Sequence, residues 1–373
     1  MENSFSYWER DTYFTNIDFT VVGAGIVGLN CALELKRKHP KAKILVLERG
    51  ILPKGASTKN AGFACFGSIS ELLDDLQTLS EEEMIRLVEK RDSGLQQLKN
   101  TLGEDNIGYK TYKGYELFLK DDPELFESCM ENRDYINELL FPLFKTEVFS
   151  VEKNSFSFSG IHDHYMVNHL EGQLNTGKMM DALYSKCVEE GIKILYGVEV
   201  ASYEETGENV SVKTNVISFN TKKLLLATNG FASKFVNDEI KPVRAQVLVT
   251  KPIKNLHIKG TFHLDKGYYY FRNINDRILL GGGRNLDFNA EETSEFGLTS
   301  LVQDKLKELL KTVILPQTPH EIDTSWSGIM GVGSTKEPII KALSHNIFCG
   351  VRLGGMGIAI GAHVGKELAN LTT

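Results

Sequence analysis

The chain has 373 residues, a net charge of −7, 42% hydrophobic and 24% charged residues. Soluble domains average about 25% charged residues, so the composition is that of a globular protein and excludes a disordered one. The mild acidity and the lack of a dense Lys/Arg run disfavour a nucleic-acid partner. At about 100–200 residues per domain, the length predicts two domains.

Cysteine usage and hydropathy predict the compartment. The odd number of scattered cysteines, with no Cys-x-x-Cys pair, disfavours a disulfide framework and a structural metal site. Residues 1–10 contain no apolar stretch typical of a signal peptide. No apolar run reaches about 18 residues, the length needed to span a membrane. We therefore expect a cytoplasmic protein without a transmembrane segment and without a bound metal. The cysteines are Cys31, Cys65, Cys129, Cys187 and Cys349.

The strongest motif lies near the amino terminus. A short β-rich run, 18–22, meets Gly23, Gly25 and Gly28 at the spacing G-x-G-x-x-G, and a helical pattern follows over 29–38. A second β run, 42–47, ends at Glu48. The glycines allow a tight turn, close backbone approach to a pyrophosphate and close helix packing, while the helix amino end attracts phosphate. A carboxylate placed like Glu48 accepts hydrogen bonds from a ribose. The alternative is a glycine-rich turn without a nucleotide.

The remaining elements follow in chain order. Helical patterns cover about 70–102 and 123–140, and a further helix is expected over 175–190 before a strand at 192–196. A buried strand ends in a turn at 227–230, and residues 243–283 have an antiparallel β pattern with a hairpin turn at 273–276. A helix at 300–312 follows. A second glycine-rich loop, 350–358, precedes the last helix. Two such loops suggest a large cofactor held at both ends.

These motifs, taken in order, resemble those of the D-amino-acid oxidase-like superfamily of FAD-dependent oxidoreductases. The glycine oxidase, sarcosine oxidase and gamma-glutamylputrescine oxidase types are the most similar. The resemblance extends over essentially the whole chain. Besides Gly23, Gly25, Gly28 and Glu48, it rests on 56–63, 172–175, 197–200, 227–230, 242–246, 325–328 and 354–357.

The resemblance implies an α/β fold. A Rossmann-like FAD-binding domain, assembled from residues 15–80, 165–240 and 325–373, would be interleaved with an antiparallel-sheet substrate domain, assembled from 81–164 and 241–324. The sarcosine oxidase group attaches FAD to a cysteine after the Trp-x-Gly stretch. No cysteine stands between Trp326 and Gly333, so we expect non-covalent FAD.

The resemblance also implies the cofactor-binding residues. Val200 would contact the adenine region, and the loops 58–63 and 353–358 would lie along the isoalloxazine. The helix starting near Gly357 would direct its positive end at the flavin pyrimidine, which becomes anionic on reduction. The full set is Gly23, Gly25, Ile26, Val27, Gly28, Glu48, Arg49, Thr58, Lys59, Asn60, Ala61, Gly62, Phe63, Val200, Ala227, Thr228, Asn229, Gly230, Leu353, Gly354, Gly355, Met356, Gly357 and Ile358.

The substrate side departs from the family pattern. Glycine oxidase-like proteins bind the substrate carboxylate with an arginine four residues after the tryptophan of Trp-x-Gly, where this chain has Met330. Arg284 or Arg352 could replace it, because a guanidinium binds a carboxylate through two parallel hydrogen bonds. Arg352 has the competing interpretation of a flavin or loop-backbone contact, and a substrate that lacks a carboxylate near the reacting carbon is the other alternative. The resemblance to glycine oxidase over 267–272 implies that Tyr269 lines the substrate site, with Tyr268 and Tyr270 facing away. The alternative is that all three tyrosines pack within the sheet.

The function implied is oxidation of a C–N bond of an amino acid or secondary amine, giving an imine that water hydrolyses. The small-molecule substrate would pass its electrons through FAD to oxygen or to an electron carrier. Two alternatives remain open: an FAD-dependent 2-hydroxy-acid dehydrogenase and a tRNA-modifying FAD oxidoreductase of the same fold.

Overall fold

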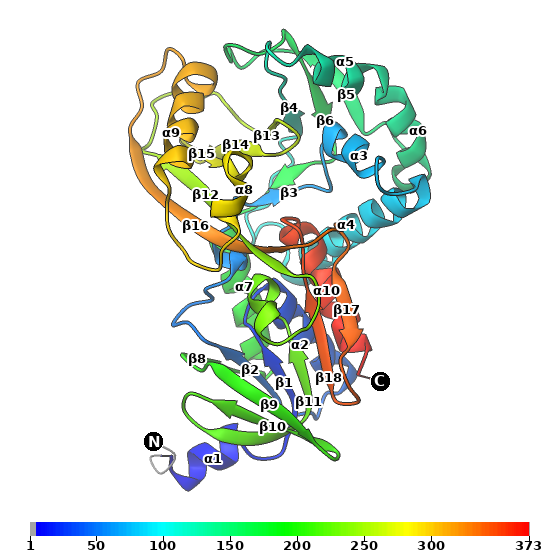
Figure 1. Cartoon of the computed structure of the whole chain (residues 1–373), viewed down its shortest axis with the longest axis vertical. Helices are drawn as coiled ribbons and strands as arrows, with labels where there is room; N and C mark the ends of the chain where they lie inside the picture. Colours follow the sequence, from blue (N-terminus) through cyan, green and yellow to red (C-terminus); the bar gives the residue numbers. More distant parts are fainter. Residues whose placement is uncertain (1–4, 373) are drawn as a thin grey trace.

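The computed structural model describes residues 5–372 and shows two large sheets, one above the other in Figure 1. Of the amino-terminal stretch analysed above, residues 1–4 lie outside the described residues. The first sheet, called the parallel sheet, occupies the lower half of the figure, and the second, the antiparallel sheet, the upper half. The expected α/β fold class is confirmed.

The parallel sheet has the order β17-β18-β11-β1-β2-β8, and the ribbon β9–β10 continues antiparallel from β11. Strands β18, β11, β1, β2 and β8 run parallel to one another. Its strands are β1 (Ile17–Val22), β2 (Ile44–Glu48), β8 (Lys193–Tyr196), β9 (Val200–Thr206), β10 (Asn209–Thr214), β11 (Ser218–Leu226), β17 (Ile339–Ala342) and β18 (Ile347–Val351). Strand β2 is buried throughout, because both of its faces are covered. Helices α2 (Ile26–Lys38), α7 (Thr176–Glu189) and α10 (Gly357–Asn370) pack on the face with Ile44 and Val46, and the β9–β10 ribbon packs on the face with Leu45 and Leu47.

The antiparallel sheet has the order β16-β12-β15-β14-β13-β4-β6-β5, and β13–β4 is its parallel pair. Its strands are β4 (Gly114–Glu116), β5 (Phe149–Lys153), β6 (His164–Asn168), β12 (Lys241–Thr250), β13 (Thr261–Leu264), β14 (Tyr269–Ile274), β15 (Arg277–Gly282) and β16 (Ile322–Val332). The expected hairpin is β14–β15, with Asn275 at φ +51 in its turn. A short pair, β3 (Phe63–Ala64) with β7 (Gly172–Gln173), forms a third sheet.

The helices expected at 29–38, 175–190 and 300–312 are present with shifted ends, whereas the pattern over 123–140 forms two helices that meet at Asn132. The helices at 7–13 and 288–291 were not expected from the sequence. The segment expected as one pattern over 70–102 divides at Ser80, which starts a capping box. The helices are α1 (Tyr7–Tyr13), α2 (Ile26–Lys38), α3 (Ile69–Asp75), α4 (Glu81–Leu102), α5 (Pro123–Glu131), α6 (Arg133–Phe144), α7 (Thr176–Glu189), α8 (Phe288–Glu291), α9 (Ser300–Leu309) and α10 (Gly357–Asn370). Short helical turns are η2 (Ala56–Thr58), η3 (Asn229–Lys234), η4 (Arg284–Leu286) and the π-helical η5 (Leu310–Ile314).

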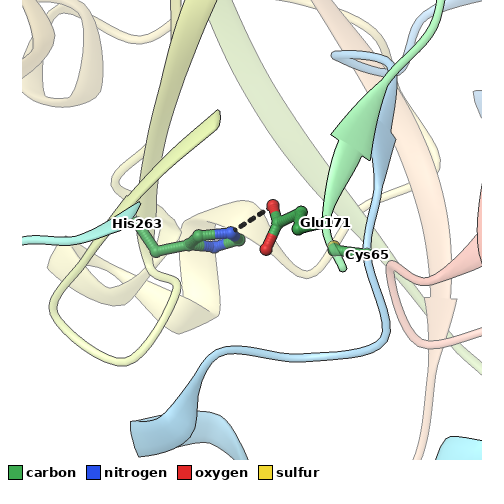
Figure 2. A group of neighbouring side chains, drawn as sticks. All are labelled: Cys65, Glu171 and His263. Carbon is green, nitrogen blue, oxygen red and sulfur yellow. Dashed lines mark hydrogen bonds and ion pairs between the residues drawn. The ribbon is translucent and has the colours of Figure 1, made fainter. Parts of the chain in front are cut away.

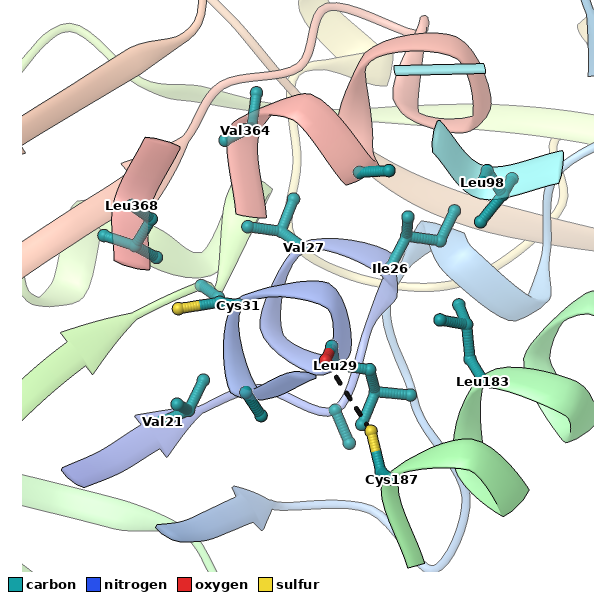
Figure 3. Close-up of a cluster of buried hydrophobic side chains, with 14 of the residues drawn as sticks. Val21, Ile26, Val27, Leu29, Cys31, Leu98, Leu183, Cys187, Val364 and Leu368 are labelled. Carbon is teal, nitrogen blue, oxygen red and sulfur yellow. Dashed lines mark hydrogen bonds between the residues drawn. The ribbon is translucent and has the colours of Figure 1, made fainter. Parts of the chain in front are cut away.

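Helix α2 lies between the last helix of the chain and α7 (Figure 3). On one side Val27 faces Val364 of α10; on the other, the Cys187 thiol of α7 donates to the Leu29 carbonyl at 3.6 Å. A Cβ built on Gly365 would lie 2.6 Å from the Val27 carbonyl oxygen. The two helices therefore approach as closely as they do because position 365 has no side chain.

The division of the chain into segments 15–80, 165–240 and 325–373 against 81–164 and 241–324 remains a proposal, and two elements bear on its boundaries. Helix α4 packs along α10 and shares a hydrophobic core with α2. Strand β16 pairs with β12 along its whole length, in the antiparallel sheet. Within residues 5–372 no helix is long and apolar enough to cross a membrane.

Replacing Gly365 by alanine tests the close approach of α2 and α10. Alanine normally stabilises a helix relative to glycine by about 1 kcal/mol, but the new methyl group would overlap the Val27 carbonyl. We expect Gly365→Ala to destabilise the fold by about 1–3 kcal/mol in denaturant unfolding.

The matched control is Gly177→Ala in α7. Gly177 is exposed, and its Cβ would meet only the Asn175 side chain, at 3.4 Å. This substitution should be neutral or stabilising. Equal effects of the two substitutions would contradict the packing argument.

Candidate active site

The glycine-rich loop after β1 has the geometry expected for a phosphate site. Gly23 has φ +107, and a Cβ on Gly28 would lie 1.9 Å from the Gly23 carbonyl oxygen. Gly25 is the N-cap of α2 and has no side chain with which to cap the first N–H groups of the helix. The amino end of α2, at Gly25, Ile26 and Val27, lines a pocket. Its backbone N–H groups and helix dipole suit an anionic phosphate.

Glu48, at the end of β2, binds the same glycine-rich loop through its carboxylate. Its carboxylate is 6% exposed and accepts hydrogen bonds from the backbone N–H of Gly50 at 2.9 Å and of Ala24 at 3.3 Å. The next residue, Arg49, stacks its guanidinium 3.9 Å from the ring centre of Phe231. Both Glu48 and Arg49 line the pocket, next to the glycine loop.

The pocket has a volume of about 520 Å³ and extends from Glu48 past the glycine loop to the antiparallel sheet. This is within the range of small-molecule sites. All but three of the predicted cofactor-binding residues line it: Gly23, Gly25, Ile26, Val27, Glu48, Arg49, Lys59, Asn60, Ala61, Gly62, Phe63, Val200, Ala227, Thr228, Asn229, Leu353, Gly354, Gly355, Met356, Gly357 and Ile358.

The three predicted residues that the structure does not place on the pocket wall support it from behind. Gly28 allows α2 to pack on Gly23, as described above. A Cβ on Gly230 would lie 2.5 Å from the Met330 carbonyl oxygen. The Thr58 hydroxyl donates to the Pro53 carbonyl at 2.7 Å.

The second glycine-rich loop brings the amino end of α10 to the pocket. Gly354 and Gly355 have φ +58 and +90, which reverse the chain just before the helix. The Leu353 N–H donates to Asn229 Oδ1 at 3.1 Å, so this loop is tied to the end of β11. Gly357 and Ile358 line the pocket, and the positive end of the α10 dipole is therefore directed at it.

The placement of Tyr269 is a correction to the sequence analysis. Tyr269 is buried in the core of the antiparallel sheet, in the same cluster as Phe271 and residues of α9, whereas Tyr268 and Tyr270 line the pocket. Side chains alternate along a strand, so Tyr269 shares a face with Phe271. Because Phe271 belongs to the core, the opposite face of the strand, with Tyr270, faces the pocket. The pocket face is therefore displaced by one residue from the one that the resemblance implied.

Arg284 lies where the sequence analysis expected a substrate-binding cation. It follows β15, lines the pocket, and places its guanidinium 5.5 Å from the Tyr268 ring centre and 5.2 Å from that of Phe288. Within the described part of the chain, no carboxylate lies within 4.0 Å of this guanidinium. Its hydrogen-bond donors are therefore available to an anion.

The placement of Arg352 is a second correction. Its guanidinium donates to the Glu337 carbonyl at 3.0 and 3.2 Å, to the Glu239 carbonyl at 3.3 Å and to the Thr335 hydroxyl at 2.9 Å. It does not line the pocket. The loop-backbone interpretation therefore holds, and Arg352, at φ +64, fixes the turn before Gly354. Met330, at the position of the missing family arginine, lines the pocket.

A buried ion pair borders the pocket at the antiparallel sheet (Figure 2). His263 of β13 is 5% exposed, and its Nε2 lies 2.7 Å from Oε1 of Glu171, which is 1% exposed. Burial alone would lower the pKa of His263, but the charge and hydrogen bond of Glu171 outweigh it and raise this pKa to about 9. The Cys65 thiol lies beside them, and burial raises its pKa well above the usual value.

This pair makes stability depend on pH. A histidine whose pKa rises on folding stabilises the folded state fully below its unfolded value of about 6.5, and the stabilisation is lost as the pH rises through about 9. We expect Glu171→Gln to reduce the free energy of unfolding by about 3 kcal/mol at pH 6 and by much less at pH 9.5.

Denaturant unfolding at the two pH values measures this difference. Glu152→Gln is the matched control, because Glu152 pairs with Lys113 at 2.9 Å at a partly exposed position and has no histidine partner. A Glu171→Gln effect that is equal at pH 6 and pH 9.5 would contradict the assignment.

Several pocket residues were not predicted from the sequence. Tyr268, Tyr270, Ser57 and His263 line the pocket, and the Ser57 hydroxyl accepts a hydrogen bond from the Ile26 N–H at 3.0 Å. The alternation of Phe271 with its neighbours could have identified both tyrosines. His263 and Glu171 are 92 residues apart, and no spacing signal links them.

The pocket fits FAD on the structure's own features. A glycine cradle that a Cβ would fill, a carboxylate at the end of β2 and a second helix amino end lie along one cavity. A model of the family described as FAD dependent oxidoreductase matches residues 18–371. The chain belongs to this family. The expected FAD dependence and enzyme class are thereby confirmed.

Individual proteins of known sequence or structure are similar over most of their length. The probable oxidoreductase OrdL of Haemophilus influenzae is 23% identical over 372 residues, covering 96% of this chain and 83% of that protein. L-proline dehydrogenase from P. horikoshii superposes with a TM-score of 0.75 and 18% identity, over 96% and 93% of the two chains. Glycine oxidase from Geobacillus kaustophilus gives 0.75 and 16%, over 95% and 94%. These structures share the fold of this FAD dependent oxidoreductase.

The attachment of FAD is testable without a substrate. Cys65 lines the pocket, but its neutral thiol is a weak nucleophile. We expect acid precipitation of the purified protein to leave the yellow flavin in the supernatant. Flavin in the pellet would contradict non-covalent binding, and its release in Cys65→Ser would then identify the attachment point.

Proposed function

We propose that this chain oxidises a C–N bond of an amino acid or secondary amine, with the imine then hydrolysed by water. The observation that carries the proposal is Arg284, which has no acidic partner among residues 5–372 and lines the same pocket as the cofactor loops. Glycine oxidase and the iminodiacetate oxidase of Chelativorans sp. BNC1, which has a TM-score of 0.74 and 14% identity over 95% and 94% of the two chains, share this fold. The oxidase activities by which these two proteins are named support the same class of reaction.

Arg284 would bind the substrate carboxylate. Its planar guanidinium can donate two parallel hydrogen bonds, and the rings of Tyr268 and Phe288 hold it in place. The Tyr268 and Tyr270 side chains line the pocket beside it. The Tyr270 phenol is a neutral donor, since burial raises its pKa to about 12. These residues would fix one end of the substrate.

The rest of the substrate would lie against apolar surface. Phe63, Met330 and Val247 line the pocket, and Phe63 meets Tyr270 edge to face with ring centres 5.6 Å apart. The chemistry that FAD supplies when bound is acceptance of a hydride from the amine-bearing carbon. The chain's own contribution is then orientation of that carbon and exclusion of water.

The final electron acceptor would be oxygen or an electron carrier, and the protein would act in the cytoplasm. The latter is supported by the five cysteines, all of which are buried and unpaired by disulfides. A reducing compartment keeps thiols in this state.

Anaerobic bleaching of the flavin absorbance tests the proposal. We expect bleaching by amines that carry a carboxylate, from a panel of amino acids, N-alkyl amino acids, polyamines and 2-hydroxy acids. Arg284→Met should raise KM for the carboxylated substrate about 10- to 100-fold, equivalent to about 1.4–2.8 kcal/mol of lost charged hydrogen bonding.

Arg133→Met is the matched control, since Arg133 is paired with Asp134 at 2.6 Å on the surface of α6. It should leave KM unchanged. Bleaching by 2-hydroxy acids alone would replace amine oxidation with the dehydrogenase alternative. Bleaching only by carboxylate-free amines would contradict the role given to Arg284.

A further inference from the structure

Arg272 is a buried arginine directly behind the pocket wall. It lies on β14, is 5% exposed, and donates through Nη1 to the Gly62 carbonyl at 3.0 Å and to the Leu174 carbonyl at 2.8 Å. Gly62 and Phe63 line the pocket, whereas Arg272 does not. Arg272 therefore contacts the pocket wall through the backbone at Gly62.

The charge of Arg272 has no counter-ion nearby. Among residues 5–372 no carboxylate lies within 4.0 Å of it, and its buried Nε has no hydrogen-bond partner. Burial lowers the pKa of Arg272 from 12.5 to about 10, so the side chain remains a cation at neutral pH. Burying a charge without an ionic partner is costly. Two carbonyl dipoles compensate it only in part.

The segment that Arg272 holds is tightly specified. Gly62 has φ +77, and a Cβ there would lie 2.5 Å from the Leu174 carbonyl oxygen and 3.0 Å from the Arg272 guanidinium. The Gly62 N–H donates to Asn60 Oδ1 at 2.9 Å, and the Gly62 carbonyl also accepts from the Leu174 N–H at 2.9 Å. Both backbone polar groups of Gly62 are thus engaged, and its carbonyl accepts a second hydrogen bond from the Arg272 guanidinium.

We propose that Arg272 is a positioning residue that fixes the loop 58–63 and supplies a positive field through it, favouring the anionic reduced cofactor over the neutral oxidised one. A low-dielectric wall transmits this field more strongly than water would. The inference rests on the cofactor side of the proposed function, namely FAD lying along this loop. It does not depend on which substrate is oxidised.

The test is the midpoint potential of the bound flavin, together with the FAD dissociation constant. Arg272→Met removes the charge and the hydrogen bonds, whereas Arg272→Lys retains the charge and loses the planar guanidinium with its parallel N–H donors. We expect Arg272→Met to weaken binding of reduced relative to oxidised cofactor about tenfold, which lowers the two-electron potential by about 30 mV. Arg272→Lys should keep the wild-type potential while weakening binding of both redox forms alike.

Arg277→Met is the matched control on the same hairpin. Arg277 pairs with Asp323 at 2.5 Å at the surface, and its removal should change neither quantity. Equal midpoint potentials in wild type and Arg272→Met, or equal potential shifts in Arg272→Met and Arg272→Lys, would overturn the proposal that the Arg272 charge favours the reduced cofactor. If Arg272→Met binds no FAD, the potential is measured in Arg272→Gln instead. Loss of FAD from all three variants, with helical circular dichroism retained, would also overturn the proposed field effect. Failure of amine oxidation, with the potential shift observed, would overturn the proposed function alone.

Discussion

The structure depends on how one short segment, 57–64, is held between two sheets. The Ser57 hydroxyl binds the amino end of α2, while the Trp326 Nε1–H of β16 donates to the Lys59 carbonyl at 3.0 Å. Arg272 of β14 holds Gly62, and β3 pairs with β7 just beyond it. The segment therefore receives contacts from helix α2, which packs on the parallel sheet, and from strands β14 and β16 of the antiparallel sheet. Its position determines the pocket between them.

This constraint explains why the pocket wall comes from distant parts of the chain. The glycine loop near Gly25, the segment around Gly62, the end of β11 at Asn229 and the loop at Gly354 all line one cavity. Their carboxyl-end positions follow from the parallel sheet, whose strands end at a common edge where ligands bind. The antiparallel sheet contributes the opposite end, with Tyr270, His263 and Arg284. A cofactor would contact one sheet with its phosphates and the other near its reacting ring.

The sequence predicted motifs whose parts are adjacent in the chain, but not contacts between residues that are distant in the chain. The fingerprint at Gly23–Gly28 and Glu48 could be recognised because turn, helix and strand follow one another within about thirty residues. The tyrosine register could not be taken from a family pattern, because one residue of shift exchanges the core and pocket faces. Arg352 was compatible with two roles until the carbonyls of Glu239 and Glu337 were placed around it. Arg272, His263 and Glu171 carry no local signal, since each meets partners about a hundred residues away.

A crystal structure of the protein with FAD and a non-oxidisable amine-free carboxylic acid would test the central claim most directly. The account predicts the adenosine ribose at Glu48, the flavin ring along 58–63, and the carboxylate bound by two hydrogen bonds from Arg284. A carboxylate bound elsewhere, with Arg284 turned away from the pocket, would contradict the assignment of the substrate site. A flavin ring remote from Gly62 would contradict the assignment of the cofactor site.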